Sequence, residues 1–414
     1  MINYFYDCYT ILNKVYSEKA FFKQALNNTP IEEKNRALIV KTCYGVLDKD
    51  IELSYYIEKL TTKTPKLVIR TILKISMYAL KYLNKHDYAV IKNAVELTKK
   101  LGKGGASGFV NAFLWRFVKE DIALPKDRKS FLSVKYSYPL FLIEELVKDY
   151  GEERTEKIIS SINENTCLSF YKVNGEEYLK ERNYQFEKTP FDNVFIVKNF
   201  VRNSDYDLGV YTYQALGSVA ICESVEPCKT LLDACSAPGG KSIRLSKKCE
   251  SIYSTDIHPH RVNLITEYKN RMGVKNITES VMDASEFNPE FKDKFDGVLC
   301  DAPCSGTGVI NDNPDIKLNR SFNDLLSIVD TQKAILKNLS NYVKVGGYLY
   351  YSTCSILTRE NQAIIKSFLS DKTGFSVCEI SSLLPFQKCE YGIQFLPDIS
   401  NGLGFYICKL KREK

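Results

Sequence analysis

The sequence predicts a multidomain chain, with an all-α N-terminal region, a small α+β connector and a C-terminal α/β domain containing a doubly wound, mostly parallel sheet. Three observations favour this fold class. The chain has 414 residues, more than one ordinary hydrophobic core organises. Apolar residues recur at helical spacing over roughly the first 120 residues. From about residue 206, short strand-like runs alternate with helical stretches. We therefore expect domains at 1–125, 126–205 and 206–414.

The N-terminal region is expected to be helical because of its periodicity. In "TPKLVIRTILKISMYALKYL" (64–83), Thr64 is the expected N-cap, and Pro65 takes the first helical position. A second periodic segment opens at Asp87. A glycine-rich break and an aromatic-rich helix follow in "GKGGASGFVNAFLWRF" (102–117). The two apolar stripes consist of Ile69, Leu73, Met77, Leu80 and Leu83, and of Val90, Ala94, Leu97 and Leu101.

The positive charge of the chain is concentrated in this region. Residues 1–130 contain 23 lysines and arginines against 13 acidic residues, whereas the remainder contains 34 against 37. This imbalance is consistent with a polyanionic partner bound through its phosphates, and equally with a solvated helical surface. Lys99, Lys100 and Lys103 lie beside the glycine-rich break. Helix-start amides there can help to bind phosphate, although a structural turn explains the break as well.

Several classes of protein are disfavoured. No apolar run approaches the roughly 18 residues of a membrane span, and the start "MINYFYDCYT" does not resemble a signal peptide. We therefore expect a cytoplasmic protein without a membrane partner, whose 13 cysteines are reduced and mostly buried. There is no CxxC pair, and "HPH" (258–260) is interpreted as loop, so no metal site is expected.

The middle of the chain is a linker followed by a small mixed segment. "LPKDRKS" (124–130) has the composition of a linker, and a helix is expected after Pro139. "TCLSFYKVN" (166–174) and "NVFIVKNF" (193–200) are short β-rich runs.

The C-terminal domain places polar residues at the ends of its expected strands. The strand-like runs are "TLLDAC", "SIYSTDI", "ITESVMDA", "FDGVLCDAP" and "GGYLYYSTC". Ligands of doubly wound sheets bind outside the carboxyl ends of the strands. The residues at those ends are Asp233, Asp256, Asp283, Asp301 and Cys354.

A glycine turn at the first of these strands indicates an adenosine ligand. "LLDACSAPGGKS" (231–242) reads as strand, tight turn and helix, but matches neither GxGxxG nor a Walker motif. Asp256 follows Asp233 by 23 residues, a suitable spacing for holding ribose hydroxyls, and Asp283 can reach an adenine amino group. Without a phosphate-binding motif, S-adenosyl-L-methionine (SAM) fits better than NAD or ATP.

Two cysteines at neighbouring strand ends suit methylation of a pyrimidine carbon. "DAPCSGTG" contains Asp301 and Cys304, and "YYSTCS" contains Cys354. Carbon 5 of cytosine is a poor nucleophile until a thiolate adds at carbon 6 and makes the ring enamine-like. One cysteine can add while the other assists release. The residues alone do not rank the two.

These motifs resemble those of the RNA (cytosine-5)-methyltransferases, the Nol1/Nop2/Sun family. "DACSAPGGKS", "DAPCSGTGVI" and "YSTCSILTREN" are similar to its motifs I, IV and VI. "GVYTYQALGS" (209–218) is similar to the stretch that precedes motif I. The helical N-terminus with "GFVNAFLWRF" resembles a NusB-like RNA-binding domain, which marks the branch acting on small-subunit ribosomal RNA.

The resemblance implies a Rossmann-like, class I SAM-dependent methyltransferase domain and a role for each site residue. Cys354 would be the nucleophile, Cys304 would assist release, and Asp301 would bind the cytosine ring edge. Lys241 would point into the same pocket, where it could lower a thiol pKa. The expected cofactor-binding residues are Asp233, Ala234, Cys235, Pro238, Gly239, Gly240, Lys241, Asp256, Arg261, Asp283 and Asp301.

The remaining cysteines are interpreted as packing residues, and a few positions depart from the family pattern. Asn311 and Asp312 stand where basic residues are usual, and Leu318 follows "PDIK" in place of tryptophan. The family also tends toward Asp-Gly-Phe-Phe where the chain reads "NGLGFYICKL". The packing cysteines are Cys8, Cys43, Cys167, Cys222, Cys228, Cys235, Cys249, Cys300, Cys378, Cys389 and Cys408.

The expected function is therefore transfer of methyl from SAM to carbon 5 of a cytidine in 16S ribosomal RNA by a monomer that does not act on DNA. The same chemistry on a transfer RNA is one alternative. The other is a non-catalytic RNA-binding factor of the antitermination type. That alternative predicts decay of at least one catalytic motif, whereas Asp301, Cys304, Cys354 and the glycine turn are all present.

Overall fold

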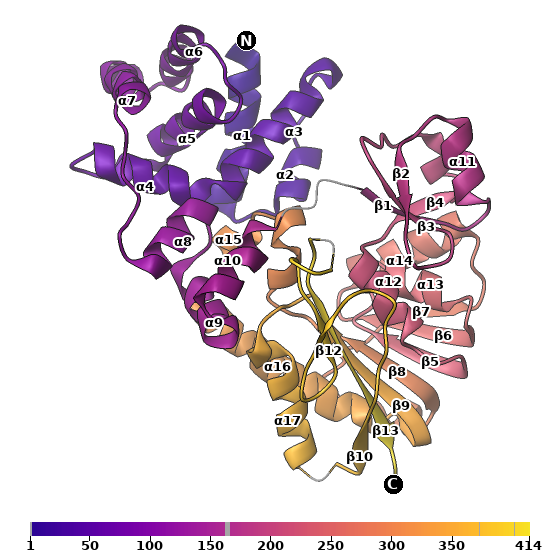
Figure 1. Ribbon diagram of the computed structural model, residues 1–414. Coiled ribbons are helices and arrows are strands. Elements are labelled where there is room, and N and C mark those ends of the chain that lie inside the picture. Colours follow the sequence, from indigo (N-terminus) through magenta and orange to yellow (C-terminus); the bar gives the residue numbers. More distant parts are fainter. Residues whose placement is uncertain (1, 162–165, 372, 401) are drawn as a thin grey trace. The chain divides into compact units, whose positions relative to one another are not determined.

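A computed structural model describes residues 2–161, 166–371, 373–400 and 402–414. The chain divides into two compact units. The first unit contains residues 1–156 together with 312–321, and the second contains residues 157–311 and 322–414. Figure 1 shows helices α1 to α9 of the first unit in indigo and purple, and α15 in orange. Within the described ranges, no helix combines the length and apolar character needed to cross a bilayer.

The first unit is built from helices, as its periodicity predicts. Its helices are α1 (Ile2–Glu18), α2 (Phe22–Asn27), α3 (Glu33–Asp48), α4 (Asp50–Leu60), α5 (Leu67–Lys81), α6 (Asp87–Lys100), α7 (Ser107–Lys119), α8 (Arg128–Tyr136), α9 (Leu140–Tyr150), α10 (Glu152–Ser160) and α15 (Ile316–Asn319). A 3-10 turn, η1 (Gly104–Ala106), joins α6 to α7 at the glycine-rich break. Helix α10 runs on past the boundary of the unit at residue 156.

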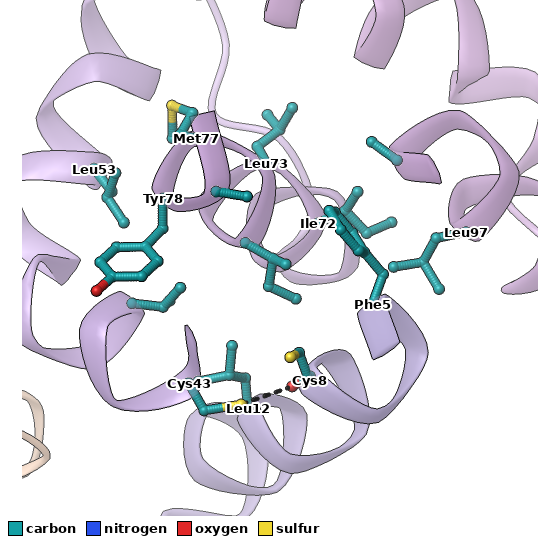
Figure 2. Close-up of a cluster of buried hydrophobic side chains, with 14 of the residues drawn as sticks. Phe5, Cys8, Leu12, Cys43, Leu53, Ile72, Leu73, Met77, Tyr78 and Leu97 are labelled. Carbon is teal, nitrogen blue, oxygen red and sulfur yellow. Dashed lines mark hydrogen bonds between the residues drawn. The ribbon is translucent and has the colours of Figure 1, made fainter. Parts of the chain in front are cut away.

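The predicted stripes form the core of this unit. Leu73 and Met77 of α5 are fully buried, and Ala94 and Leu97 of α6 pack into the same cluster. Figure 2 shows Leu73, Met77 and Leu97 in this cluster. The Cys43 thiol donates to the Cys8 carbonyl there at 3.7 Å, so these cysteines are packing residues as expected. The helices are therefore held together mainly by apolar burial.

One expected helix start is wrong. Helix α5 begins at Leu67, not at Pro65, and Lys66 is its N-cap with an extended backbone at ψ 152°. The first helical hydrogen bond runs from the Ile69 amide to the Lys66 carbonyl at 2.9 Å. Thr64 and Pro65 therefore precede the helix, because the φ that proline fixes suits extended backbone as well as helix.

A segment from the second half of the sequence completes the helical unit. Lys317 of α15 is almost fully buried, with its ammonium 2.7 Å from Asp48 Oδ1 and 4.6 Å from the centre of the Tyr138 ring. Burial alone would raise the pKa of Asp48, but Lys317 and Lys49 hold it below its usual value. Leu318 packs against the helical core. The departure from the family's tryptophan is therefore accommodated in an apolar contact.

The second unit begins with a small antiparallel sheet. Its strands β1 (Thr166–Phe170), β2 (Phe186–Lys188), β3 (Val194–Val197) and β4 (Tyr211–Tyr213) are ordered β2-β3-β1-β4. Helix α11 (Gly175–Glu181) packs against β3. Both β-rich runs that the sequence predicts here are strands, and they pair with each other.

The main sheet has the order β11-β12-β13-β9-β8-β5-β6-β7, and β10 also pairs with β13. Strands β9, β8, β5, β6 and β7 are parallel, and β13 runs antiparallel to β9. The strands are β5 (Cys228–Ala234), β6 (Cys249–Asp256), β7 (Ile277–Val281), β8 (Phe295–Asp301), β9 (Val343–Thr353), β10 (Phe375–Cys378), β11 (Gln387–Lys388), β12 (Ile393–Phe395) and β13 (Phe405–Arg412). The helices of this region are α12 (Leu216–Glu223), α13 (Gly240–Leu245), α14 (Pro259–Met272), α16 (Phe322–Ser340) and α17 (Gln362–Ser370).

Alternation along the strands produces two apolar cores, one on each face of the sheet. Leu231 of β5 packs into the cluster that contains residues of α12 and α13, whereas Leu232 packs into the cluster that contains residues of α16 and α17. Neighbouring side chains of a strand point to opposite faces. The sheet is therefore covered on both faces, which confirms the doubly wound fold class (Figure 1).

We expect Leu73→Ala to destabilise the helical unit by about 2–5 kcal/mol, because a fully buried leucine would leave a cavity among close-packed helices. The single tryptophan, Trp115, packs against this core, so its fluorescence during urea denaturation of the full chain reports this unit. Tyr88→Ala is the matched control in α6, since Tyr88 is 74% exposed. Equal midpoints for the two variants would contradict the assignment of the core.

Candidate active site

The ends of β8 and β9 bring two cysteines together. The strands pair in parallel with Asp301 opposite Ser352, and Cys304 and Cys354 lie in the loops that follow. Their sulfurs are 3.1 Å apart, and both residues are partly exposed. The sequence predicted this juxtaposition from strand ends alone. Among the remaining cysteines, Cys8, Cys43, Cys222, Cys249, Cys300 and Cys408 are buried.

Of the two thiols, Cys304 has a strongly raised pKa. The hydrogen bond with Cys354 and burial raise the pKa of Cys304 well above its usual value, and the carboxylate of Glu360 raises it further. The thiol pKa that Lys241 lowers is that of Cys222, although burial outweighs this effect and leaves the pKa of Cys222 above its usual value. At neutral pH, Cys304 is protonated.

Lys241 instead forms an ion pair with Asp301. Its ammonium lies 2.6 Å from Asp301 Oδ2, and the Ser352 hydroxyl donates to Asp301 Oδ1 at 2.9 Å. Burial alone would lower the pKa of Lys241, but the Asp301 carboxylate raises it above its usual value. Lys241 begins α13 beside the glycine turn, whereas Asp301 ends β8. The pair therefore links the expected cofactor turn to the cysteine loops.

The turn after β5 requires glycine at one position. Gly239 has a φ of 103°, a conformation that side chains rarely adopt, and an added Cβ would lie 3.3 Å from Ile265 Cγ2. The Ser236 backbone amide donates to the Thr255 carbonyl at 2.9 Å, and the Gln214 side-chain amide donates to the Gly240 carbonyl at 3.2 Å. The turn that contains Ala234, Cys235, Pro238, Gly239 and Gly240 is thus anchored to neighbouring segments.

Asp256 and Arg261 lie at the end of β6 and the start of α14. The Arg261 guanidinium is 3.3 Å from Asp256 Oδ2 and donates to the Ala237 carbonyl at 3.2 Å. The His258 amide donates to Asp256 Oδ1 at 3.2 Å. Arg261 therefore connects the acid of the second strand to the glycine turn of the first.

Asp233 and Asp283 occupy different environments. Asp233 is fully buried and accepts from the Ser242 hydroxyl at Oδ2, while its Oδ1 has no hydrogen-bond partner among the described residues. Burial raises the pKa of Asp233 to about 7. Asp283, two residues beyond β7, accepts from the Ser285 amide and hydroxyl at 2.8 and 2.6 Å. A buried acceptor beside the turn and acids at successive strand ends fit the hydroxyl and amino donors of an adenosine group.

Two other sequence features have structural explanations. The Asn311 side chain donates to the Ser161 carbonyl at 2.7 Å and to the Gly402 carbonyl at 3.4 Å, so it ties loops together where the family usually has a basic residue. In the part of the chain that the structure describes, His, Cys, Asp and Glu side chains form no cluster suited to a metal ion. The interpretation of "HPH" as loop is wrong, because His258 is the N-cap of α14 and proline suits the first helical position, which Pro259 occupies. The rings of His258 and His260 stack with centres 5.5 Å apart.

The sequence analysis missed several side chains that support this site. Ser352 holds Asp301, Ser242 holds Asp233, and Glu360 accepts hydrogen bonds from the loop of Cys304. Only proximity in sequence to the motifs pointed to them. Ser352 and Glu360 contact segments 51 and 55 residues away in the chain, which periodicity does not reveal, whereas Ser242 lies nine residues after Asp233 within the same motif.

Two protein families match the chain. The family described as 16S rRNA methyltransferase RsmB/F matches residues 221–411, and the NusB family matches residues 5–119. The first match covers the main sheet with its cysteine loops, and the second covers α1 to α7 apart from the first few residues.

Curated relatives resemble the chain along nearly its whole length. The probable ribosomal RNA small subunit methyltransferase B of Bacillus subtilis (strain 168) is 30% identical over 428 residues, which cover 97% of this chain and 96% of that protein. The protein of the same description from Coxiella burnetii is 29% identical, with 96% of each chain covered. Ribosomal RNA small subunit methyltransferase B of Proteus mirabilis is 28% identical, with 92% of each covered.

Solved structures share the fold at lower identity. The crystal structure of PH0851 matches with a TM-score of 0.84 at 22% identity and covers 99% of both chains. NSun6 from Pyrococcus horikoshii with SFG matches with a TM-score of 0.58 at 18% identity, covering 70% of this chain and 98% of that one.

We expect Asp233→Asn to change how stability depends on pH. The folded-state pKa of about 7 lies above the ordinary value near 4, so the stabilising contribution of the neutral carboxyl is present below pH 4. It is lost as the pH rises through 7. Between pH 5.5 and 8 the wild type should therefore lose about 1–3 kcal/mol relative to the asparagine variant, measured by urea unfolding followed by circular dichroism.

The matched control is Asp330→Asn, because the Asp330 side chain is 80% exposed. It should leave the pH dependence unchanged. If the difference between wild type and Asp233→Asn were the same at both pH values, Asp233 would already be ionised at pH 5.5.

Proposed function

This chain belongs to the RsmB/F family of ribosomal RNA small-subunit methyltransferases, and we propose that it methylates carbon 5 of a cytidine in 16S rRNA. The near-complete coverage of the curated relatives supports an rRNA methyltransferase. The observation that carries the finer proposal is the distance of 3.1 Å between the sulfurs of Cys304 and Cys354, at strand ends beside Asp301.

The chemistry follows from what carbon 5 of cytosine needs. The thiolate of Cys354 forms a bond to carbon 6, and the ring electrons move so that carbon 5 becomes nucleophilic. Asp301 hydrogen-bonds the polar edge of the ring and holds the base in this state, while its partner Lys241 fixes its orientation. After carbon 5 has taken the methyl group, its proton passes to water and the double bond between carbons 5 and 6 reforms. The bond between carbon 6 and sulfur breaks, and its electron pair returns to Cys354 as a thiolate.

We assign assistance in this last step to Cys304. Its sulfur lies beside the departing sulfur, so it can stabilise the thiolate of Cys354 by a hydrogen bond as the bond to carbon 6 breaks. The raised pKa of Cys304 keeps the proton for that hydrogen bond in place at neutral pH.

The proposed cofactor is SAM, which when bound supplies an electrophilic methyl group. The turn from Ala234 to Gly240 would hold it, with Asp256 on the ribose hydroxyls and Asp283 toward the adenine. Asp233 accepts from the Ser242 hydroxyl in the helix that follows this turn, and Arg261 of α14 donates to the Ala237 carbonyl within the turn. Two observations support the assignment: the unpartnered buried oxygen of Asp233, and the solved NSun6 structure with SFG, which shares this fold.

The proposed partner is RNA, bound through the basic helical unit. The match to the NusB family and the excess of lysine and arginine in residues 1–130 support this assignment. A thiolate reaches carbon 6 only when the base is outside its stack. The target cytidine is therefore either flipped out or already in a loop.

Substituting the two cysteines should give opposite results. Cys354→Ser should abolish transfer of labelled methyl from SAM to small-subunit RNA, because the hydroxyl is too weak a nucleophile. Cys304→Ala, which removes the hydrogen-bond donor, should instead accumulate a protein–RNA adduct, visible as a shifted band on a denaturing gel. Cys389→Ser is the control, because Cys389 lies in the loop between β11 and β12, where its thiol donates to the Gln387 carbonyl. Full activity of Cys354→Ser would overturn the nucleophile assignment.

Mass-spectrometric mapping should separate ribosomal from transfer RNA as substrate. Cells that lack this chain should lose 5-methylcytidine at a position of 16S rRNA and regain it when the chain is restored. The Cys354→Ser chain, expressed to the same level, should fail to restore it. Loss of 5-methylcytidine from transfer RNA alone would favour the alternative substrate. No change in either RNA would favour a non-catalytic binding factor.

A further inference from the structure

A buried carboxylate joins the loops that carry the two cysteines. Glu360 ends η5 (Thr358–Glu360), a short 3-10 turn after Cys354, and its side chain is fully buried. The Ser305 amide donates to Oε1 at 2.7 Å, and the Ser305 hydroxyl donates to Oε2 at 2.5 Å. The Ser355 hydroxyl also donates to Oε2. One side chain thus binds the residue that follows each cysteine.

Further hydrogen bonds fix the same two loops around this carboxylate. Thr307 Oγ1 lies 2.9 Å from the Ser355 hydroxyl and accepts from the Ile356 amide at 3.1 Å. The Gly308 amide donates to the Cys354 carbonyl at 2.9 Å. These contacts connect the two loops directly, and the carboxylate of Glu360 lies at their centre.

Helix α16 holds the other side of the Cys304 loop. The Gln332 amide donates to the Pro303 carbonyl at 2.9 Å and to Glu360 Oε1 at 3.2 Å. Cys304 is therefore held through the residue before it and the residue after it. The 3.1 Å separation of the sulfurs depends on this arrangement, because both cysteines lie in loops outside the sheet.

Packing alone does not explain the buried carboxylate of Glu360. Burying a charge is unfavourable unless hydrogen bonds satisfy it, and a neutral side chain of similar size would avoid that cost. A carboxylate, however, accepts several short hydrogen bonds at once and orients their donors more strongly than a neutral group does. Its charge also acts on the site itself, because it contributes to the raised pKa of Cys304.

We propose that Glu360 is a positioning residue that sets the distance between the sulfurs of Cys304 and Cys354. The proposal rests on the cysteine chemistry proposed above, in which one sulfur must form a bond and the other must reach it during release. The Glu360 carboxylate accepts hydrogen bonds from Ser305, Ser355 and Gln332. It acts through Ser305 and Ser355.

The test uses Glu360→Gln in the full chain, which keeps the size of the side chain and removes its charge. Single-turnover transfer of labelled methyl to small-subunit RNA should fall at least tenfold, while SAM affinity by calorimetry stays within twofold. Glu379→Gln is the matched control, since the side chain of Glu379 is 85% exposed, and it should behave as wild type.

A second measurement reports the sulfur distance without activity. Hydrogen peroxide converts two adjacent thiols to a disulfide with formation of water, and peptide mass spectrometry counts the pairs that form. Cys228 and Cys249, whose sulfurs are 3.4 Å apart at the starts of β5 and β6, serve as an internal reference. In Glu360→Gln, formation of the Cys304–Cys354 disulfide should slow at least fivefold relative to the reference pair, after each rate is divided by the thiolate fraction of Cys304 found by alkylation.

The titration of Cys304 gives a third readout that a purely structural role would not move. Removing the Glu360 charge should shift half-maximal alkylation of Cys304 by iodoacetamide to lower pH, because that carboxylate raises the pKa of the thiol. Ser305→Ala serves as the second variant if Glu360→Gln fails to fold. It removes one hydroxyl donor and should slow disulfide formation in the same direction.

The outcomes separate this inference from the proposed function. Wild-type rates of methyl transfer and of disulfide formation in Glu360→Gln would overturn the positioning role. Equal slowing at both cysteine pairs would also overturn it, because that result indicates general destabilisation. If the wild type itself failed to methylate RNA, the proposed function would fail, and slower closure of the Cys304–Cys354 pair alone would still support the role of Glu360.

Discussion

The parallel pairing of β8 with β9 is the constraint on which the site depends. With Asp301 opposite Ser352, the two strands end at the same edge of the sheet, and the loops that follow carry Cys304 and Cys354 to one place. A shift of one residue in this register would turn the side chains of one strand to the opposite face. The two apolar cores fix the register, because Leu299 and Tyr350 pack on one face while Cys300 and Tyr351 pack on the other.

An ion pair connects the proposed cofactor turn to the acid that is proposed to bind the base. Lys241 comes from the helix after β5 and Asp301 from the end of β8, so their ion pair spans two strands that are neighbours in the sheet. Both groups are partly buried, which strengthens their attraction compared with a pair in water. Because Lys241 is held in this way, we expect it to orient the acid that would hold the base.

Much of this arrangement follows from the sequence, for a physical reason. Strand periodicity and the rule for carboxyl ends predicted that Asp233, Asp256, Asp301 and Cys354 lie at one edge of the sheet. Parallel strands all end at the same edge, so the residues at their carboxyl ends are brought together there. The α5 stripe of Ile69, Leu73 and Met77 was also predictable, because the buried apolar residues of one helical face recur at regular spacing in the sequence. The rest depends on tertiary contacts. Glu360, Gln332 and Ser352 act on segments distant in sequence, and nothing in local spacing shows which donors a buried carboxylate finds. The start of α5 was misjudged because Pro65 is compatible with both helix and extended backbone.

The path of the chain after Cys304 makes the helical unit dependent on the catalytic sequence. The chain leaves the second unit after Asn311, and residues 312–321 belong to the first unit. There Lys317 is buried against Asp48, and Asp315 accepts from the Phe22 amide at 3.2 Å. A fragment that ended at residue 156 would lose both partners, and Asp48 would keep only the ion pair with Lys49. Losing Lys317 would weaken the electrostatic support of Asp48, because its carboxylate would then have one cationic partner in place of two. The helical unit is therefore completed only when the chain has passed the loop that carries Cys304 and residues 312–321 have been made.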